Sequence, residues 1–164
     1  MRCSIFAKIK RAKVKQQKAI IYEQYDSYEA LPTEDRALVE AATEATRRAY
    51  APYSHFRVGA AARLRSGEII TASNCESEVF PSGMCAERSL LYFLASNHSD
   101  NAITALAIAS SPSEHECYPC GACRQSLLDA ETRQQSPMRI IMAGGGRATV
   151  VDSAVSLLPF SFKL

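Results

Sequence analysis

Cys85-Ala86-Glu87-Arg88 and Pro119-Cys120-Gly121-Ala122-Cys123 are the two stretches of this 164-residue chain that constrain its fold most strongly. The cysteines of the second stretch are three residues apart, so in a helix both sulfurs lie on one face and can chelate a single ion. Cys85 supplies a third sulfur from the start of another predicted helix. The fold must therefore bring two helix N-termini, with their unpaired backbone N–H groups, to one metal site.

The number of cysteines in these stretches favours a catalytic metal. A structural zinc site normally uses four protein ligands, whereas a catalytic site uses three and leaves one position for water. Glu87 lies two residues beyond Cys85, close enough to exchange a proton with a zinc-bound water without itself binding the metal. This pattern is typical of a hydrolase. The alternative is a structural zinc module without enzymatic activity, in which Cys75, Cys117 or His115 supplies a fourth ligand.

Length and composition indicate one compact domain. A chain of 164 residues with 47% hydrophobic residues can bury a substantial core, and nothing requires a second domain. No apolar run approaches the roughly 18 residues of a membrane span, and the N-terminus lacks the apolar block of a secretory signal. We therefore expect a soluble, cytoplasmic protein in which Cys3, Cys75 and Cys117 are free thiols.

The N-terminal segment is strongly basic. Residues 1–22 carry seven basic side chains and no acidic one, which leaves 12 basic and 17 acidic side chains, a net charge of −5, in residues 23–164. A nucleic-acid arm, a membrane-surface arm and a transit peptide are alternatives for such a segment, but a solvated extension is the simplest explanation. We expect residues 1–30 to be an extension, partly strand (residues 7–15) or disordered, and residues 31–164 to be a single domain.

Hydrophobic periodicity predicts helices and strands in alternation. Helices are predicted at residues 33–49, 84–97 and 120–130. Strands are predicted at residues 56–64, 68–72, 102–110, 138–143 and 148–151, with Ser66-Gly67 as a hairpin turn between the first two. This alternation is typical of a layered α/β domain whose helices pack on a largely buried sheet.

Four stretches of the chain resemble cytidine deaminases, and they occur in the order of that family. They are Ala-Tyr-Ala-Pro-Tyr-Ser-His-Phe-Arg-Val-Gly-Ala-Ala at residues 49–61, Asn74-Cys75-Glu76 followed by Phe80 and residues 85–88, residues 119–125, and Leu-Leu-Pro-Phe-Ser-Phe at residues 157–162. The resemblance covers roughly residue 31 to the C-terminus. It implies a three-layer αβα fold with a five-stranded mixed sheet. It also implies a homotetramer in which neighbouring subunits complete each site.

The same resemblance implies a reaction and a cofactor. The expected reaction is zinc-dependent hydrolytic deamination of cytidine and 2′-deoxycytidine to uridine and 2′-deoxyuridine, a step of pyrimidine salvage. One Zn²⁺ per subunit would be held by Cys85, Cys120 and Cys123, and Glu87 would transfer the protons. Three thiolates and Zn²⁺ sum to −1, so the positive helix ends and the guanidinium of Arg88 are needed to offset that charge.

The resemblance also implies substrate contacts. Asn74 and Glu76 match residues that bind the sugar 3′-hydroxyl, and Phe56 matches a phenylalanine that lines the pyrimidine pocket. The backbone N–H of Ala86 would contact the pyrimidine carbonyl, and Phe162 would enter the site of a neighbouring subunit. A gripped 3′-hydroxyl leaves no room for the next phosphate of a polynucleotide, so a base in RNA is a poor candidate. Another aminopyrimidine nucleoside, such as a nucleoside antibiotic, stays open as an alternative substrate.

Two positions depart from the family pattern. Ser77 stands where the family usually has asparagine, and Phe80 stands where it usually has tyrosine. The missing hydroxyl at Phe80 removes one hydrogen bond, which is worth about 0.5 to 1.5 kcal/mol net. Neither change touches the metal ligands or Glu87, so we expect activity to survive.

Overall fold

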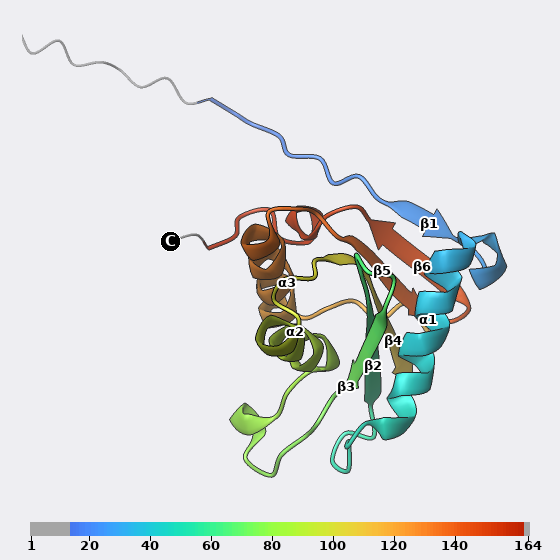
Figure 1. Ribbon diagram of the computed structural model, residues 1–164. Helices are drawn as coiled ribbons and strands as arrows, with labels where there is room; N and C mark the ends of the chain where they lie inside the picture. Colours follow the sequence, from blue (N-terminus) through green and yellow to red (C-terminus); the bar gives the residue numbers. More distant parts are fainter. Residues whose placement is uncertain (1–13, 163–164) are drawn as a thin grey trace, which may run out of the picture.

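In the computed structural model, which describes residues 14–162, a mixed sheet is covered by helices on both faces (Figure 1). Its six strands lie in the order β1-β6-β5-β4-β2-β3, and all neighbouring pairs are antiparallel except β4 and β5. The strands are β1 (Glu23–Tyr25), β2 (Arg57–Leu64), β3 (Ile69–Ser73), β4 (Ile103–Ser111), β5 (Arg139–Gly144) and β6 (Arg147–Val151).

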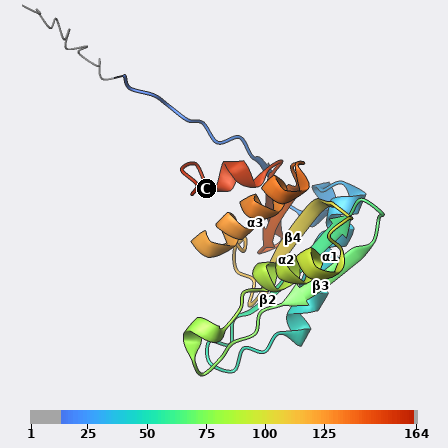
Figure 2. The same cartoon turned by 60° about the vertical axis from the view of Figure 1, so that its left-hand side comes forward.

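Three helices form the outer layers. Figure 1 shows α1 on one face of the sheet and α2 with α3 on the other, and Figure 2 shows the last two side by side. Their bounds are α1 (Thr33–Ala45), α2 (Ala86–Asn97) and α3 (Gly121–Gln134), with 3-10 turns at Tyr28–Ala30, Thr46–Arg48, Phe80–Ser82 and Ala154–Leu157. None of the helices in the described part of the chain is long and apolar enough to cross a membrane.

The core lies in two layers because successive side chains of a strand point to opposite faces of the sheet. On β4, Leu106 and Ile108 face α2 and α3, whereas Ala105 and Ala107 face α1. The small residues on the second face let α1 approach closely. At Gly59 on β2, an added Cβ would lie 2.0 Å from the carbonyl oxygen of Ala42, so only glycine fits there.

The topology brings the starts of α2 and α3 to one end of the sheet. Gly59 pairs with Ser73 and Arg57 pairs with Ser111, so the C-terminal ends of β3 and β4 lie at the same edge. The chain after β3 leads into α2, and the chain after β4 leads into α3. Residues that begin these two helices are therefore neighbours in space although 35 positions separate Cys85 from Cys120 in sequence.

The predicted three-layer α/β fold is confirmed, with differences at the ends of elements. The first helix ends at Ala45 and continues as a 3-10 turn, the second begins at Ala86, and the third extends to Gln134. Each boundary depends on capping and packing that hydrophobic periodicity does not encode. The strand predicted at residues 7–15 lies outside the described residues except for its last two, which belong to no helix or strand.

The prediction of five strands was wrong, because β1 adds a sixth. Its sequence Glu-Gln-Tyr has no apolar alternation, so no local pattern marks it as a strand. It forms because the edge of β6 offers unpaired backbone groups and Arg139 of β5 holds Glu23, with 2.6 Å between Nη2 and Oε2. The same guanidinium bonds the buried Asp35 of α1 through Nε at 2.8 Å.

Candidate active site

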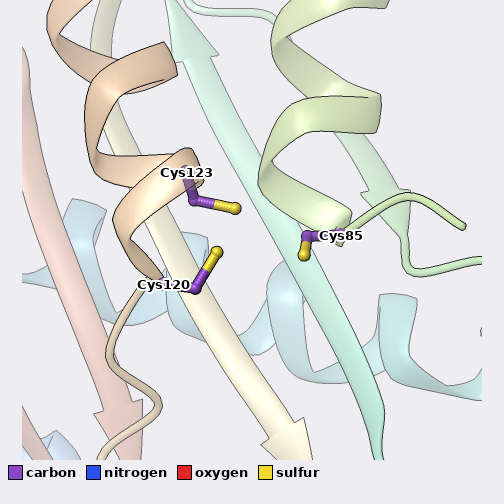
Figure 3. Close-up of side chains that lie close together, drawn as sticks. All are labelled: Cys85, Cys120 and Cys123. Carbon is purple, nitrogen blue, oxygen red and sulfur yellow. The ribbon is translucent and has the colours of Figure 1, made fainter. Parts of the chain in front are cut away.

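Three cysteine sulfurs meet at the N-termini of α2 and α3. Figure 3 shows Cys85 at the start of one helix and Cys120 and Cys123 at the start of the other, with their sulfurs pointing toward a common centre. All three sulfurs lie within 4.8 Å of one another. Cys85 and Cys120 are the N-cap residues of their helices, so the unpaired N–H groups of both first turns surround the cluster. The predicted metal cluster is thus confirmed.

The chemistry of these donors fits zinc. Sulfurs at tetrahedral positions about 2.3 Å from zinc lie about 3.8 Å apart, which agrees with the observed grouping. One of the three thiols is prepared for ionisation: a hydrogen bond from Cys123, and then the guanidinium of Arg88, lower the pKa of Cys85 to about 5 against the effect of burial. Cys85 and Cys123 share one proton in a hydrogen bond. Cys123 keeps that proton, so its pKa is raised.

The cluster has three ligands within the described part of the chain. Cys75, Cys117 and His115 do not belong to this group, nor does any other histidine, aspartate or glutamate that the structure describes. Cys75 and Cys117 are free thiols, as predicted, while Cys3 lies outside the described residues. The geometry therefore does not support a closed structural site in which one of these residues is the fourth ligand.

Glu87 is a buried carboxyl group, one oxygen of which has no hydrogen-bond partner. It lies in the first turn of α2, its exposed fraction is 4%, and its Oε2 atom has no partner. Burial raises the pKa of Glu87, and the negative charge of the nearby Cys85 thiolate adds to the effect. A buried oxygen left unpaired costs free energy, so its persistence indicates a partner that arrives with water or a ligand.

Arg88 lies beside the same cysteine cluster. Its Nη2 atom lies 3.8 Å from the sulfur of Cys85, and that hydrogen bond raises the pKa of Arg88 although burial opposes the shift. The guanidinium thereby draws negative charge from the cluster, as the charge balance of three thiolates requires. Its Nε atom is buried without a partner, so this side chain also has an unused donor.

A cavity of about 650 Å³ opens in front of these residues. The predicted site residues that line it are Phe56, Asn74, Glu76, Cys85, Glu87, Arg88 and Cys120. The other lining residues come mainly from the segment before β2 and the segment between β3 and α2, so the cavity is a cleft between the two helix starts and these two loops. Its size suits a small organic molecule.

Asn74 ties the segment before β2 to the segment after β3. Its Oδ1 atom accepts a hydrogen bond from the backbone N–H of Val58 at 2.7 Å, and its Nδ2 atom donates to the carbonyl oxygen of Phe56 at 3.0 Å. One hydrogen on Nδ2 and one lone pair on Oδ1 are left over. The side chain thus positions Phe56 beside the cavity and still has groups for a ligand.

Glu76 fixes the other half of the same loop. Its Oε2 atom accepts hydrogen bonds from the backbone N–H groups of Tyr53 at 2.9 Å and Ser54 at 3.2 Å, and Oε1 accepts from the Ser54 hydroxyl. The Ser54 hydroxyl is the main cause of a lowered pKa for Glu76. Glu76 is therefore an anionic acceptor in the lining of the cavity.

Ala86 and Phe162 do not line this cavity. Ala86 is buried in the first turn of α2, where its backbone N–H has no helical partner. Phe162 lies in the C-terminal tail with an exposed fraction of 71%, and its carbonyl oxygen accepts a long hydrogen bond of 3.4 Å from Gln125. In this single subunit Phe162 therefore contributes nothing to the cavity.

Several cavity residues were not predicted from the sequence. Tyr53, Cys117 and Tyr118 all line the cavity, and the ring of Tyr53 packs edge-on against Phe80 with their centroids 6.0 Å apart. Tyr53 lies inside the stretch at residues 49–61, so its place in that motif was a usable signal. For Tyr118 the one signal in the sequence is its proximity to Cys120, and that proximity does not indicate where the side chain points.

The comparisons with known proteins agree with this geometry. Residues 32–136 match the family described as the cytidine and deoxycytidylate deaminase zinc-binding region. A cytidine deaminase of Halalkalibacterium halodurans is 33% identical over 129 residues, which cover 76% of this chain and 91% of that protein. A blasticidin-S deaminase of Bacillus cereus is 33% identical over 102 residues, 58% of this chain and 72% of that protein.

Solved structures show the same relationship. The crystal structure of a cytidine deaminase from Burkholderia pseudomallei has a TM-score of 0.68 and 32% sequence identity, covering 77% of this chain and 97% of that one. The family model describes a zinc-binding region, and it spans both helix starts that carry the three cysteines. Sequence, fold and metal cluster therefore place this chain in the family of zinc-dependent cytidine and deoxycytidylate deaminases.

Proposed function

We propose that the protein removes the amino group of cytidine and 2′-deoxycytidine by hydrolysis of the C4–N bond, giving uridine or 2′-deoxyuridine and ammonia. The observation that carries this proposal is the buried, unpartnered carboxylate oxygen of Glu87 beside a three-cysteine metal cluster. Such a buried group is suited to moving a proton to and from a ligand in the cavity. The names of the relatives and solved structures support the substrate.

The chain's own residues have defined tasks in this reaction. Zinc held by Cys85, Cys120 and Cys123 supplies a Lewis acid that makes water acidic enough to attack at neutral pH. Glu87 accepts a proton from the attacking water and delivers it to ring N3, while the hydroxide oxygen bonds to C4. Glu87 then moves the second proton to the amino group, the C4–N bond breaks, and ammonia leaves. The raised pKa of Glu87 suits a carboxyl that must hold the proton between these steps.

The cavity favours a nucleoside over a nucleotide. Among the lining residues that the structure describes, Arg88 is the one cation, and its guanidinium is bound to the sulfur of Cys85. The lining also carries the anionic Glu76, whose lowered pKa keeps it charged. A phosphate at the sugar would meet repulsion there and no free cation. We therefore assign Asn74 and Glu76 to the sugar hydroxyl, and Phe56 and the Ala86 N–H to the base.

A related substrate is a second candidate. The similarity to a blasticidin-S deaminase favours another aminopyrimidine nucleoside, because the same transfer of protons removes the amino group of any such ring. The two candidates share the metal ligands and Glu87 and differ at the sugar end of the cavity. Turnover of blasticidin S by protein that does not convert cytidine would select this candidate.

The assembly belongs to the same proposal. We assign the protein to a homotetramer acting in pyrimidine salvage in the cytoplasm. Its domain is the one predicted at residues 31–164, enlarged by β1 and the turn that follows it, so that the proposed extension is confined to the residues before β1. The support comes from Phe160 and Phe162, which are 94% and 71% exposed in a single subunit. Aromatic side chains so exposed on a short tail are best explained by burial against another subunit. The mass of the protein in solution tests this assembly.

Turnover by zinc-loaded protein tests the proposed function. Purified protein with one zinc per subunit should convert cytidine and deoxycytidine, which the loss of cytidine absorbance measures. Glu87→Gln keeps the size of the side chain and removes the proton acceptor, so turnover should fall by about 10² to 10⁴-fold with zinc content unchanged. Glu78→Gln changes an exposed carboxylate outside the cavity and serves as the matched control. Full turnover by Glu87→Gln would remove Glu87 from the mechanism.

A further inference from the structure

A second cavity of about 380 Å³ lies next to the candidate active site. It lies between β6, the segment that leads into β1, and the tail that follows β6 in sequence. Its lining is mostly apolar and includes Tyr22, Met142, Val151, Leu157 and Pro159. Among the described residues, Tyr118 alone lines both this cavity and the active-site cavity. Tyr118 is half exposed in this subunit, and we take its ring as the wall between them.

Hydrogen bonds on both sides hold Tyr118 in this place. Its hydroxyl lies 3.3 Å from the Oγ1 atom of Thr149 on β6. The preceding residue, Cys117, donates its backbone N–H to the carbonyl oxygen of Ala143 at the end of β5, at 3.1 Å. The wall is thus anchored to two strands, through its side chain and through its backbone.

The residue that follows the wall is also fixed. The carbonyl oxygen of Pro119 accepts a hydrogen bond from Nε of Arg124 at 2.8 Å, and Nη1 of Arg124 donates to the carbonyl oxygen of Leu157 at 3.3 Å. Leu157 itself lines the second cavity. Arg124 therefore connects the segment that carries Tyr118 to the tail that closes the cavity behind it. Removing the ring would therefore open the second cavity, which these segments already enclose, without movement of the backbone.

Tyr118 belongs to the segment that leads into α3 and its two metal ligands. It is two residues from the metal ligand Cys120 and adjacent in sequence to Cys117, which also lines the cavity, whereas Asn74 and Glu76 belong to the segment after β3. In the proposed reaction, C4 and its amino group must face the metal, and the sugar must face the other end. The leaving amine therefore departs near the metal ligands, and the segment that carries Tyr118 leads into two of them. Ammonia fits there, whereas a bulkier amine needs the volume behind the ring.

We propose that Tyr118 determines which leaving group the enzyme accepts. Its ring limits the site to the unsubstituted amino group, and removing the ring joins the two cavities, so that cytidines with a large substituent on N4 become substrates. Water then adds its oxygen to C4, the C4–N4 bond breaks, the two protons of water end on N3 and on the amine, and the products are uridine and a primary amine. This proposal rests on the proposed cytidine deamination. It adds that the size of one side chain determines the specificity for the leaving group.

The test compares kcat/KM for cytidine and for N4-benzylcytidine, with uridine formation as the readout. Wild type should strongly prefer cytidine, and Tyr118→Ala should raise the ratio of benzyl to unsubstituted substrate at least tenfold. Tyr118→Phe keeps the ring and should keep the ratio of wild type. Tyr53→Ala removes another aromatic ring that lines only the active-site cavity, so it should not relax the leaving-group specificity. Zinc content is measured for every variant.

Two results would overturn the proposal. One is an unchanged ratio in Tyr118→Ala that binds one zinc and turns over cytidine, and the other is an equal relaxation in Tyr53→Ala. Wild type gives a test that does not depend on the folding of a variant, because its kcat/KM should fall steadily from N4-methyl through N4-propyl to N4-benzylcytidine. Equal rates for all three would contradict a wall at Tyr118. Failure of the proposed function is distinguishable, since wild type would then leave cytidine itself unchanged.

Discussion

Replacing Glu131 with alanine should destabilise the protein by about 2 to 6 kcal/mol, because two backbone N–H groups would lose their only acceptor. Glu131 lies on α3 with an exposed fraction of 7%. Its Oε1 atom accepts hydrogen bonds from the backbone N–H of Met138 and of Ala154, both at 2.9 Å, and Oε2 accepts from the Ser153 hydroxyl at 2.8 Å. One carboxylate thus joins the helix that carries two metal ligands to the start of β5 and to the C-terminal tail.

The magnitude follows from the number of groups left unpaired. Each buried N–H without an acceptor costs about 1 to 3 kcal/mol, and Glu131→Ala leaves two of them. Glu131→Gln should cost only about 1 kcal/mol, because its remaining oxygen can accept from both N–H groups and the Ser153 hydroxyl can turn to accept from the new amide. This geometry therefore predicts a specific order of stability: Glu131→Ala is the least stable, Glu131→Gln is intermediate, and wild type is the most stable.

Urea unfolding of zinc-loaded protein at one fixed protein concentration measures these differences through the transition midpoint. Asp129→Ala removes an exposed carboxylate from the same helix and controls for the loss of a charge on α3. The reasoning would be refuted if Glu131→Ala lost less than about 1 kcal/mol, or if glutamine and alanine were equally destabilising. In either case the three hydrogen bonds would not be what fixes the tail.

Three other changes have defined outcomes. Gly59→Ala places a Cβ 2.0 Å from a carbonyl oxygen of α1, so thermal unfolding should show a loss of at least about 1 to 3 kcal/mol. The hydrogen bond from Arg139 lowers the pKa of Glu23 below its ordinary value. The stability that Glu23 contributes is therefore present above the unfolded-state pKa and is lost as the pH falls through the folded-state pKa, so the stability difference between wild type and Glu23→Gln should shrink in acid. Burial raises the pKa of Cys117 to about 11, so at pH 8 iodoacetamide should alkylate the exposed Cys75 first, as peptide mass spectrometry can show.

Each of these predictions has a control. Gly121→Ala adds a Cβ that meets nothing within 4 Å, so it should be tolerated where Gly59→Ala is not. A Glu23→Gln difference that stays constant between pH 6 and pH 3 would contradict the role of the Arg139 pair. Alkylation of Cys117 as fast as that of Cys75 would show that burial does not protect its thiol.

The metal cluster was largely predictable because its signal is local. The spacing of Cys120 and Cys123 fixes their common helical face, and Glu87 falls in the first turn of its helix together with Cys85 at the cap. The structure adds what spacing does not contain: the burial of Glu87, its unpaired oxygen, and the contact from Arg88 to the Cys85 sulfur. Those facts depend on which elements pack over the first turn of α2.

The loops around the cavity were less predictable. Asn74 and Glu76 are polar residues two positions apart, which indicates a shared direction but does not reveal that both bind backbone groups of residues 53–58. The strand β1 and the Glu131 hydrogen bonds have no local pattern either, because their partners are 7 to more than 100 residues away. Such contacts exist only after the chain has closed its long loops.

The sequence by itself determined the class of the domain, the three metal ligands and the carboxyl group beside them, because helix periodicity and ligand spacing act over a few residues. Only the tertiary structure decided how these parts work together. The mixed sheet brings the starts of α2 and α3 to one end, buries Glu87 there, and places Tyr118 in the lining of two cavities. The physical reason is that burial and enclosed volume are properties of packed elements, and no stretch of sequence contains all the elements that create them.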